Sequence, residues 1–167
     1  DLVQSARFDL GLAANEIDVT GVEAREFAAF PAALAMPEHH PLTAKQVIVP
    51  EDLHDLPFIA LSPEDTTRGH LDALLRERGV RPRVVLETPF ANTICAMVQA
   101  GLGCGIVNPL SAELFVHHGL VLRPFMPVLL FRTLLIRPSD AVPSRIVETC
   151  IDALEQEAAL AASRMRL

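Results

Sequence analysis

The amino-acid sequence predicts an α/β fold made of two lobes with a ligand cleft between them. Of the 167 residues, 50% are apolar, which is enough for one sizeable core or two small ones. Strand patterns alternate with helical patterns through the middle of the chain, as in parallel sheets with right-handed crossovers. Two longer extended segments, near 26–36 and 121–131, have the positions expected of connections between two lobes.

The composition argues against several classes of protein. The chain has 14 basic and 21 acidic residues, a formal charge of −7, which is the wrong sign for a surface that follows nucleic-acid phosphates. No apolar stretch is long enough to span a bilayer and no signal peptide is recognisable, so we expect a cytoplasmic protein. An odd number of cysteines, placed irregularly within apolar patterns, predicts buried reduced thiols: Cys95, Cys104 and Cys150.

The opening elements are predicted to be extended. Residues 8–13 form a short apolar run typical of a buried strand in a parallel sheet, and a loop around Asn15 follows. Residues 26–36 are apolar but interrupted by Pro31, which favours a strand that leaves one lobe for the other. Residues 45–50 are predicted to form a surface strand, followed by a short helical turn.

The middle of the chain repeats a unit of strand, polar loop and helix. Residues 58–61 form an apolar strand, and a helix follows between an N-cap at Asp65 or Thr66 and a stop at Gly79. The unit then repeats with a strand over 83–87 and a helix that ends at Gly101. A further strand over 104–107 and a short helix from Asn108–Pro109 through Phe115 complete this part. The helical spacing is seen at Leu71, Leu74 and Leu75, and again at Ile94, Met97 and Val98.

The closing elements are predicted to return to the first lobe. Two apolar strands, 121–126 and 131–137, are punctuated by prolines, and the first of them is in a position to carry the chain back. We therefore expect residues 1–30 and 124–167 to form the first lobe, and residues 31–123 the second. A final helix begins near Pro143–Ser144, and its apolar residues line one side: Ile146, Val147, Cys150, Ile151, Leu154 and Ala158.

Several chemical motifs have simpler interpretations. The glycines at 101, 103 and 105 follow a helix and precede a strand, whereas a phosphate-binding loop requires the opposite order, so a helix stop is favoured over a nucleotide site. The pairs His39–His40 and His117–His118 are adjacent loop residues, which favours solvated side chains over metal ligands. No nucleophile motif is found, and Glu51–Asp52 and Glu64–Asp65 are explained by exposed charge and helix capping. We expect no catalytic residues, metal or cofactor.

Polar residues cluster where strands end and helices begin. In open α/β sheets, ligands bind beyond the carboxyl ends of the strands, where hydroxyls, amides and helix N-termini can hold a carboxylate. The alternative is that each residue only caps its own helix. The candidates are Ser62 with Glu64 and Thr67, Thr88 with Asn92 and Thr93, and Asn108 with Asn15.

Several segments together resemble one known family. Glu87-Thr88-Pro89, residues 94–103 (ICAMVQAGLG) and residues 105–110 (GIVNPL) are similar to the effector-binding domain of LysR-type transcriptional regulators, and so are residues 8–12 (FDLGL) and 36–42 (MPEHHPL). The resemblance covers about residues 1–152. It implies a two-lobed fold like that of type 2 periplasmic binding proteins, a small-molecule effector, and a homodimer or homotetramer.

The resemblance also indicates what is missing and which effector is sensed. The family's N-terminal helix-turn-helix, through which it binds DNA, and the first strand and helix of the first lobe are absent, so we expect an incomplete first lobe. The Glu-Thr turn, the Cys-Ala-Met-Val helix and the Val-Asn-Pro-Leu ending are most similar to the subset that responds to basic amino acids and opines. Within that subset Ser62, Thr88, Phe90 and Asn92 would line the cleft, Asn108 would lie near the hinge, and Glu64 would pair with a cationic group.

Two other functions remain open from the sequence. A solute-binding receptor of a transporter shares the fold, and a signal peptide upstream would decide in its favour. An enzyme on the same fold, such as a dehydratase, would need a catalytic constellation, and turnover of a ligand would establish it.

Overall fold

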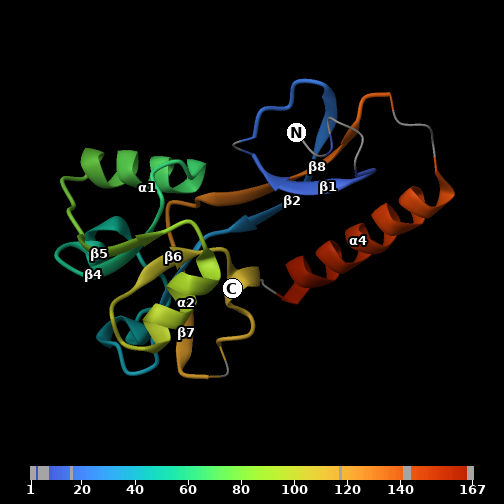
Figure 1. Ribbon diagram of the computed structural model, residues 1–167. Coiled ribbons are helices and arrows are strands. Elements are labelled where there is room, and N and C mark those ends of the chain that lie inside the picture. The colour runs from blue at the N-terminus through green and yellow to red at the C-terminus, as the bar shows by residue number, and fades with distance from the viewer. Residues whose placement is uncertain (1–2, 4–7, 16, 117, 141–143, 165–167) are drawn as a thin grey trace. The chain divides into compact units, whose positions relative to one another are not determined.

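The chain forms two compact units in a computed structural model that describes residues 3, 8–15, 17–116, 118–140 and 144–164 (Figure 1). The first unit is assembled from the two ends of the chain, residues 1–29 and 132–166. The second is continuous and contains residues 30–131. The expected α/β fold class is confirmed, with strands and helices alternating through the second unit.

The second unit is built on a mixed sheet. At its centre, β3 (Ala33–Pro37) pairs antiparallel with both β6 (Gly105–Val107) and β7 (Leu120–Pro124). The expectation that β7 returns the chain to the first lobe is wrong, because this pairing keeps β7 in the second unit, and β8 (Leu130–Pro138) returns the chain instead. Residues 125–131 stay in the second unit as well, with Phe125 buried in its core.

Parallel pairing between two strands is found on the β6 side of this sheet. There β4 (Pro57–Leu61) pairs in parallel with β5 (Arg83–Thr88), as strand–helix–strand alternation predicts. A single parallel bridge between Phe58 and Cys104 then connects β4 to the start of β6. The prediction of parallel pairing is therefore correct for β4 and β5 and wrong for β3, whose ladders are antiparallel.

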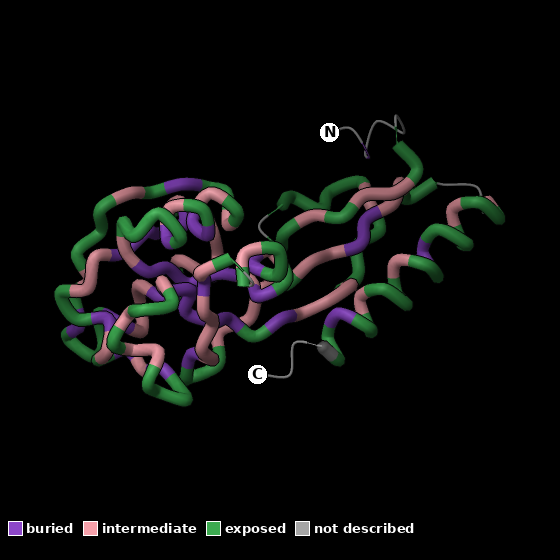
Figure 2. Tube along the Cα trace, turned by 90° about the horizontal axis from the view of Figure 1, so that it is seen from below, coloured by how far each residue is buried: buried purple, intermediate pink, exposed green. Residues whose placement is uncertain are grey.

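Helices cover both faces of the second unit's sheet. Successive side chains of β4 alternate between the faces, because strand side chains have a period of two. Phe58 packs in the cluster that contains the leucines of α1 (Thr66–Glu77), and Ile59 packs in the cluster around α2 (Ala91–Gln99). Figure 2 shows the buried, intermediate and exposed stretches along the Cα trace.

The predicted helix boundaries of the second unit are largely confirmed. The Asp65 carboxylate accepts a hydrogen bond from the Arg68 amide at 2.9 Å and caps α1. Gly79 (φ 66°) and Gly101 (φ 80°) follow α1 and α2 in the left-handed region that glycine adopts without strain. The helix expected to extend through residue 115 is shorter, since α3 spans only Pro109–Ala112.

The glycine cluster has a packing role beyond stopping the helix. A Cβ atom at position 103 would lie 2.5 Å from the Pro57 carbonyl oxygen. A Cβ atom at position 105 would lie 2.5 Å from Cγ2 of Ile94 and 2.7 Å from the carbonyl oxygen of Ile59. Both glycines thus permit the close approach of backbone and helix at the β4–β6 boundary.

The first unit has a three-stranded sheet in the order β1-β8-β2, with β1 at Gly11–Ala14 and β2 at Val22–Pro31. The prediction of a buried parallel strand at 8–13 is wrong on both points. Strand β1 pairs antiparallel with β8, and its residues alternate between half-buried and exposed. The surface strand expected at 45–50 is also absent, since Ile48 makes only an isolated bridge to Phe125, but the short turn of helix after it is confirmed at Pro50–Leu53.

The first unit also contains the longest helix, α4 (Arg145–Arg164). Ile151 and Ala161 on this helix are buried, whereas Ile146 is 82% exposed. The expected burial of Cys150 is wrong, because this residue is exposed, while Cys95 and Cys104 are buried as expected. Among the described helices, none is long and apolar enough to cross a membrane.

Candidate functional site

The candidate site lies at one edge of the second unit's sheet. Strands β4 and β5 run in parallel, and the bridge from Phe58 to Cys104 makes β6 run the same way as β4. Their carboxyl ends therefore meet at a common edge, where open α/β sheets bind ligands. Ser62 directly follows β4, Thr88 ends β5, and Asn108 directly follows β6.

Ser62 and Thr88 are brought together by the backbone. The Ser62 amide donates to the Thr88 carbonyl at 3.1 Å, which extends the β4–β5 ladder by one bond. The Ser62 carbonyl accepts from the Asp65 amide at 3.0 Å and closes the turn into α1. Ser62 is half-buried, and Glu64, at the outer side of this turn, is exposed.

The hydroxyls of the two buried threonines are both hydrogen-bonded to the backbone. Thr67 is 4% exposed, and its Oγ1 donates to the Leu130 carbonyl at 3.4 Å. Thr88 is 7% exposed, and its Oγ1 accepts from the Phe90 amide at 3.3 Å. A ligand that needs a donor from Thr67 would therefore compete with the bond to Leu130.

The remaining predicted residues of the second unit lie at helix starts. Phe90 is the N-cap of α2 and is 66% exposed, and Asn92 is exposed in the first turn of the same helix. Asn108 caps α3, with its Oδ1 accepting from the Leu110 amide at 3.0 Å. In this structure Asn108 therefore caps its own helix, which was the alternative to a role in ligand binding. Asn15 belongs to the first unit, where it is exposed in the turn after β1.

Arg68 is the main polar residue that the sequence analysis missed. Its Nε donates to both carboxylate oxygens of Asp72, each at 2.8 Å, and its Nη1 donates to the Leu61 carbonyl at 2.6 Å and to Glu87 Oε1 at 3.1 Å. Its side chain is only 12% exposed. The sequence did contain a signal for Arg68. The helix dipole disfavours a basic residue in the first turn of a helix, so its presence there indicates that tertiary contacts stabilise it.

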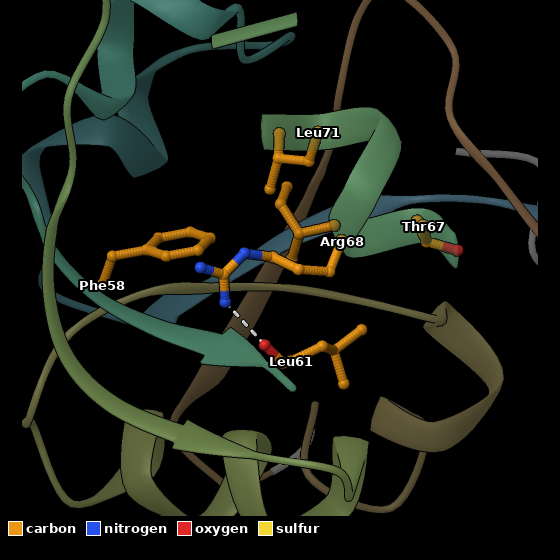
Figure 3. Close-up of a pocket in the computed structure, with 6 residues that line it drawn as sticks. Phe58, Leu61, Thr67, Arg68 and Leu71 are labelled. Atoms are coloured by element: carbon orange, nitrogen blue, oxygen red, sulfur yellow. Dashed lines mark hydrogen bonds between the residues drawn. The ribbon is translucent and has the colours of Figure 1, made fainter. Parts of the chain in front are cut away.

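A small cavity lies beside this arginine. Its volume is about 10 Å³, the size of one water molecule. Figure 3 shows the guanidinium of Arg68 between the Phe58 ring and the Leu61 backbone, while the Thr67 hydroxyl points away from it. The cavity is lined by Phe58, Leu61, Thr67, Arg68, Leu71 and Ile106.

The histidine pairs were expected to be solvated, and the structure describes only some of these residues. The side chain of His39 is 92% exposed. His40 Nδ1 accepts from the Leu42 amide at 3.2 Å, and burial lowers the pKa of His40. His117 lies outside the described residues. Within the described part of the chain, no three His, Cys, Asp or Glu side chains are placed to share a metal ion.

Comparisons with known proteins agree on one family. The model of the LysR substrate binding domain matches residues 1–159. The transcriptional activator protein LysR of Escherichia coli K12 is 37% identical over 146 residues, which are 87% of this chain and 47% of that protein. The regulatory protein NocR of Agrobacterium tumefaciens T37 is 31% identical over 147 residues, which are 88% of this chain and 49% of that protein. The chain thus spans about half the length of these relatives.

Solved structures share the fold at lower identity. The CcmR regulatory domain of Synechocystis PCC6803, solved in complex with 2-PG, matches with a TM-score of 0.75 at 20% identity, over 94% of this chain and 76% of that chain. The effector binding domain of QuiR, in complex with shikimate, matches with a TM-score of 0.71 at 17% identity, over 99% of this chain and 77% of that chain. At these identities the likeness is one of fold alone.

Proposed function

We propose a function from the premise that this chain belongs to the family of LysR substrate binding domains. The chain is an effector-binding domain of LysR-type transcriptional regulators and has their periplasmic-binding-protein-like fold. The match of the family model to residues 1–159 is the observation that carries this conclusion.

For the whole protein, we propose that effector binding changes how a separate helix-turn-helix domain engages DNA. A ligand shifts such an equilibrium only by as much as it binds one state better than the other. The protein would act in the cytoplasm as a homodimer or homotetramer and would release its effector unchanged. Sedimentation of the full-length regulator, and analysis of the effector after incubation, test these points.

For the effector, we propose a basic amino acid or an opine. The similarity to LysR and NocR over most of the chain supports this class. The chemistry of the sheet edge supports it too, because the hydroxyls of Ser62 and Thr88 and the N-terminus of α1 suit a carboxylate. The exposed Glu64 suits an ammonium or guanidinium group. Phe90, Asn92, Thr67, Asn108 and Asn15 complete the proposed set of effector-binding residues.

A thermal-shift screen tests the effector class. L-lysine, L-arginine, octopine and nopaline are compared with uncharged norleucine and with small dicarboxylic acids. A ligand at one hundred times its dissociation constant adds about 2.7 kcal/mol to the free energy of unfolding. Stabilisation by the cationic compounds is expected, and stabilisation by dicarboxylic acids alone would contradict the proposed class.

Variants test the proposed residues. Ser62→Ala and Thr88→Val should each weaken effector binding by roughly 1–3 kcal/mol if these hydroxyls hold a charged group. Thr149→Val on the exposed side of α4 is a matched control and should leave the dissociation constant unchanged. Wild-type affinity in both site variants would contradict the assignment of the site and leave the family unaffected.

A further inference from the structure

We propose that Arg68 is a positioning residue whose guanidinium holds the ends of β4 and β5 and the first turn of α1 in one arrangement. The inference rests on the proposed function for the identity of the ligand, but its central claim concerns the geometry of the free site. Arg68 would act on Ser62 and Thr88, which directly follow its strand partners in the sequence, without touching the effector.

The place of Arg68 in the sequence of α1 is not explained by helix stability. It is the third residue of the helix, directly after Thr66 and Thr67. The N-terminus of a helix carries a partial positive charge, so a cation in this turn is unfavourable. Tertiary partners must therefore favour the arginine here.

Those partners come from three different elements. Asp72 lies one turn further along α1 and binds Nε with both carboxylate oxygens, each at 2.8 Å. The Leu61 carbonyl at the end of β4 accepts from Nη1 at 2.6 Å (Figure 3). Glu87 on β5 accepts from the same Nη1 at 3.1 Å. One side chain thereby connects the helix to both parallel strands at their carboxyl ends.

The two strand partners of Arg68 are each next to a residue of the proposed site. Leu61 directly precedes Ser62, and Glu87 directly precedes Thr88. Ser62 and Thr88 are themselves linked by one backbone hydrogen bond of 3.1 Å. By fixing the Leu61 carbonyl and the Glu87 carboxylate, Arg68 would fix the relative positions of the Ser62 and Thr88 hydroxyls.

The geometry requires a guanidinium rather than a positive charge alone. A guanidinium presents five N–H donors in a rigid plane, whereas an ammonium is a compact charge on a flexible stem. Lysine at position 68 would keep the charge but could not serve Asp72, Leu61 and Glu87 from one rigid group. The fold should survive the change, because the side chains of Asp72 and Glu87 are 40% and 45% exposed and remain solvated.

Charge and geometry give different expectations for two variants. Arg68→Lys preserves the charge, so an electrostatic role predicts unchanged binding, whereas a positioning role predicts weaker binding. Arg68→Gln leaves Asp72 and Glu87 without their cation, so electrostatics predicts tighter binding of a cationic effector. Positioning again predicts weaker binding. Only a positioning role weakens the binding of a cationic probe in both variants.

The first experiment measures amide hydrogen exchange of the ligand-free protein by NMR. In Arg68→Lys, the Ser62 amide should exchange about tenfold faster, as expected when one charge-assisted hydrogen bond nearby is lost. The amide of Ala35 in β3 reports on global opening and should be unchanged. The matched control is Arg78→Lys, which alters an arginine at the other end of α1 that pairs with Glu51 at 3.0 Å.

The outcomes of the exchange experiment are distinct. Acceleration at Ser62 alone supports the proposal. Unchanged exchange at Ser62, equal acceleration at Ala35, or the same acceleration in Arg78→Lys would each overturn it.

The second experiment measures dissociation constants for L-lysine and L-arginine by calorimetry. Arg68→Lys and Arg68→Gln should each bind the preferred probe about tenfold more weakly, with Arg78→Lys as wild type. Wild-type affinity in Arg68→Lys would overturn the claim that Arg68 sets the site geometry. If the wild-type protein binds neither probe, the proposed effector class fails, and exchange at Ser62 alone decides the role of Arg68.

Discussion

The two units place apolar strands in different surroundings. In the second unit, residues 33–36 of β3 are 0% exposed, because the sheet has a hydrophobic cluster on each face. In the first unit, β1 is similarly apolar, yet Leu12 is 46% exposed. The apolar content of a strand therefore does not determine its burial. Burial depends on how many faces of the sheet are covered.

The units also differ in the contacts that connect their elements. In the first unit, ion pairs join β2, β8 and α4, among them Arg25–Glu155, Arg132–Glu26 and Arg137–Glu148. Most of these side chains are about half exposed, and ion pairs at the surface contribute little to stability. The second unit also has ion pairs, such as Arg78–Glu51, but in addition it contains two buried apolar clusters. We therefore expect changes in the second unit to have the larger effects.

The largest contrast should appear in thiol reactivity. Burial raises the pKa of the Cys95 thiol to about 11 and that of Cys104 to about 12, whereas Cys150 in the first unit is exposed. At pH 8 the reactive thiolate would be roughly one part in a thousand for Cys95 and less for Cys104. A disulfide reagent should rapidly label one thiol per native chain and all three in urea.

Replacing Cys150 with serine should remove the rapid labelling. Rapid modification of a second thiol in that variant would mean that the second unit opens more readily than its burial indicates.

A pair of leucine truncations compares the cores directly. Leu34→Ala at the centre of β3 should lower the free energy of unfolding by about 2–5 kcal/mol, because it leaves a cavity in a fully buried site. Leu12→Ala in β1 should cost less than about 1 kcal/mol. Urea denaturation monitored by circular dichroism measures both. Equal costs would contradict the difference in burial.

A pair of glycine substitutions tests close packing in the second unit. Gly105→Ala should lower the free energy of unfolding by roughly 1–3 kcal/mol, because the new Cβ would lie 2.5 Å from Ile94 and 2.7 Å from the Ile59 carbonyl. Gly69→Ala, within α1, meets nothing within 4 Å and should instead raise it by roughly 0.5–1 kcal/mol. The same denaturation assay applies. A neutral Gly105→Ala would show that the sheet can move away from α2 at little cost.

The smallest effect is expected from the ion pairs of the first unit. A double-mutant cycle of Arg25→Met and Glu155→Gln should give a coupling energy of about 0.2–1 kcal/mol, which falls in 1 M salt because exposed charges are screened. A coupling that exceeds this range and persists in salt would indicate a stronger role for charge in the first unit.

Local signals in the sequence predicted the second unit well. Strands β4 and β5 and helices α1 and α2 were recognisable because each is bounded by a cap or a glycine, and Asp65, Gly79 and Gly101 have the predicted roles. Pairing partners were less predictable. An apolar run such as 8–13 specifies neither the direction of its neighbour nor whether its outer face is covered, and both depend on tertiary structure.

The candidate site was predictable only in part, for the same reason. The polar residues after β4 and β5 were found from their position at strand ends, and the backbone does bring Ser62 and Thr88 together. Arg68 was missed because its role depends on Leu61 and Glu87, which approach it only through the parallel pairing of β4 and β5. The burial of Cys150 was predicted wrongly because the apolar face of α4 is wider than the part that packs against the rest of the protein, so residues at its side are exposed.

The discontinuous first unit has a consequence for biosynthesis. Its sheet pairs residue 11 with residue 136, so this pairing forms only after the ribosome has made β8. Strands β3 to β7 of the second unit all lie between these two strands in the sequence and can pair before β8 is made. The nascent protein would therefore hold the loops of the proposed site after β4 and β5 in nearly final form before β8 and α4 of the first unit have been made.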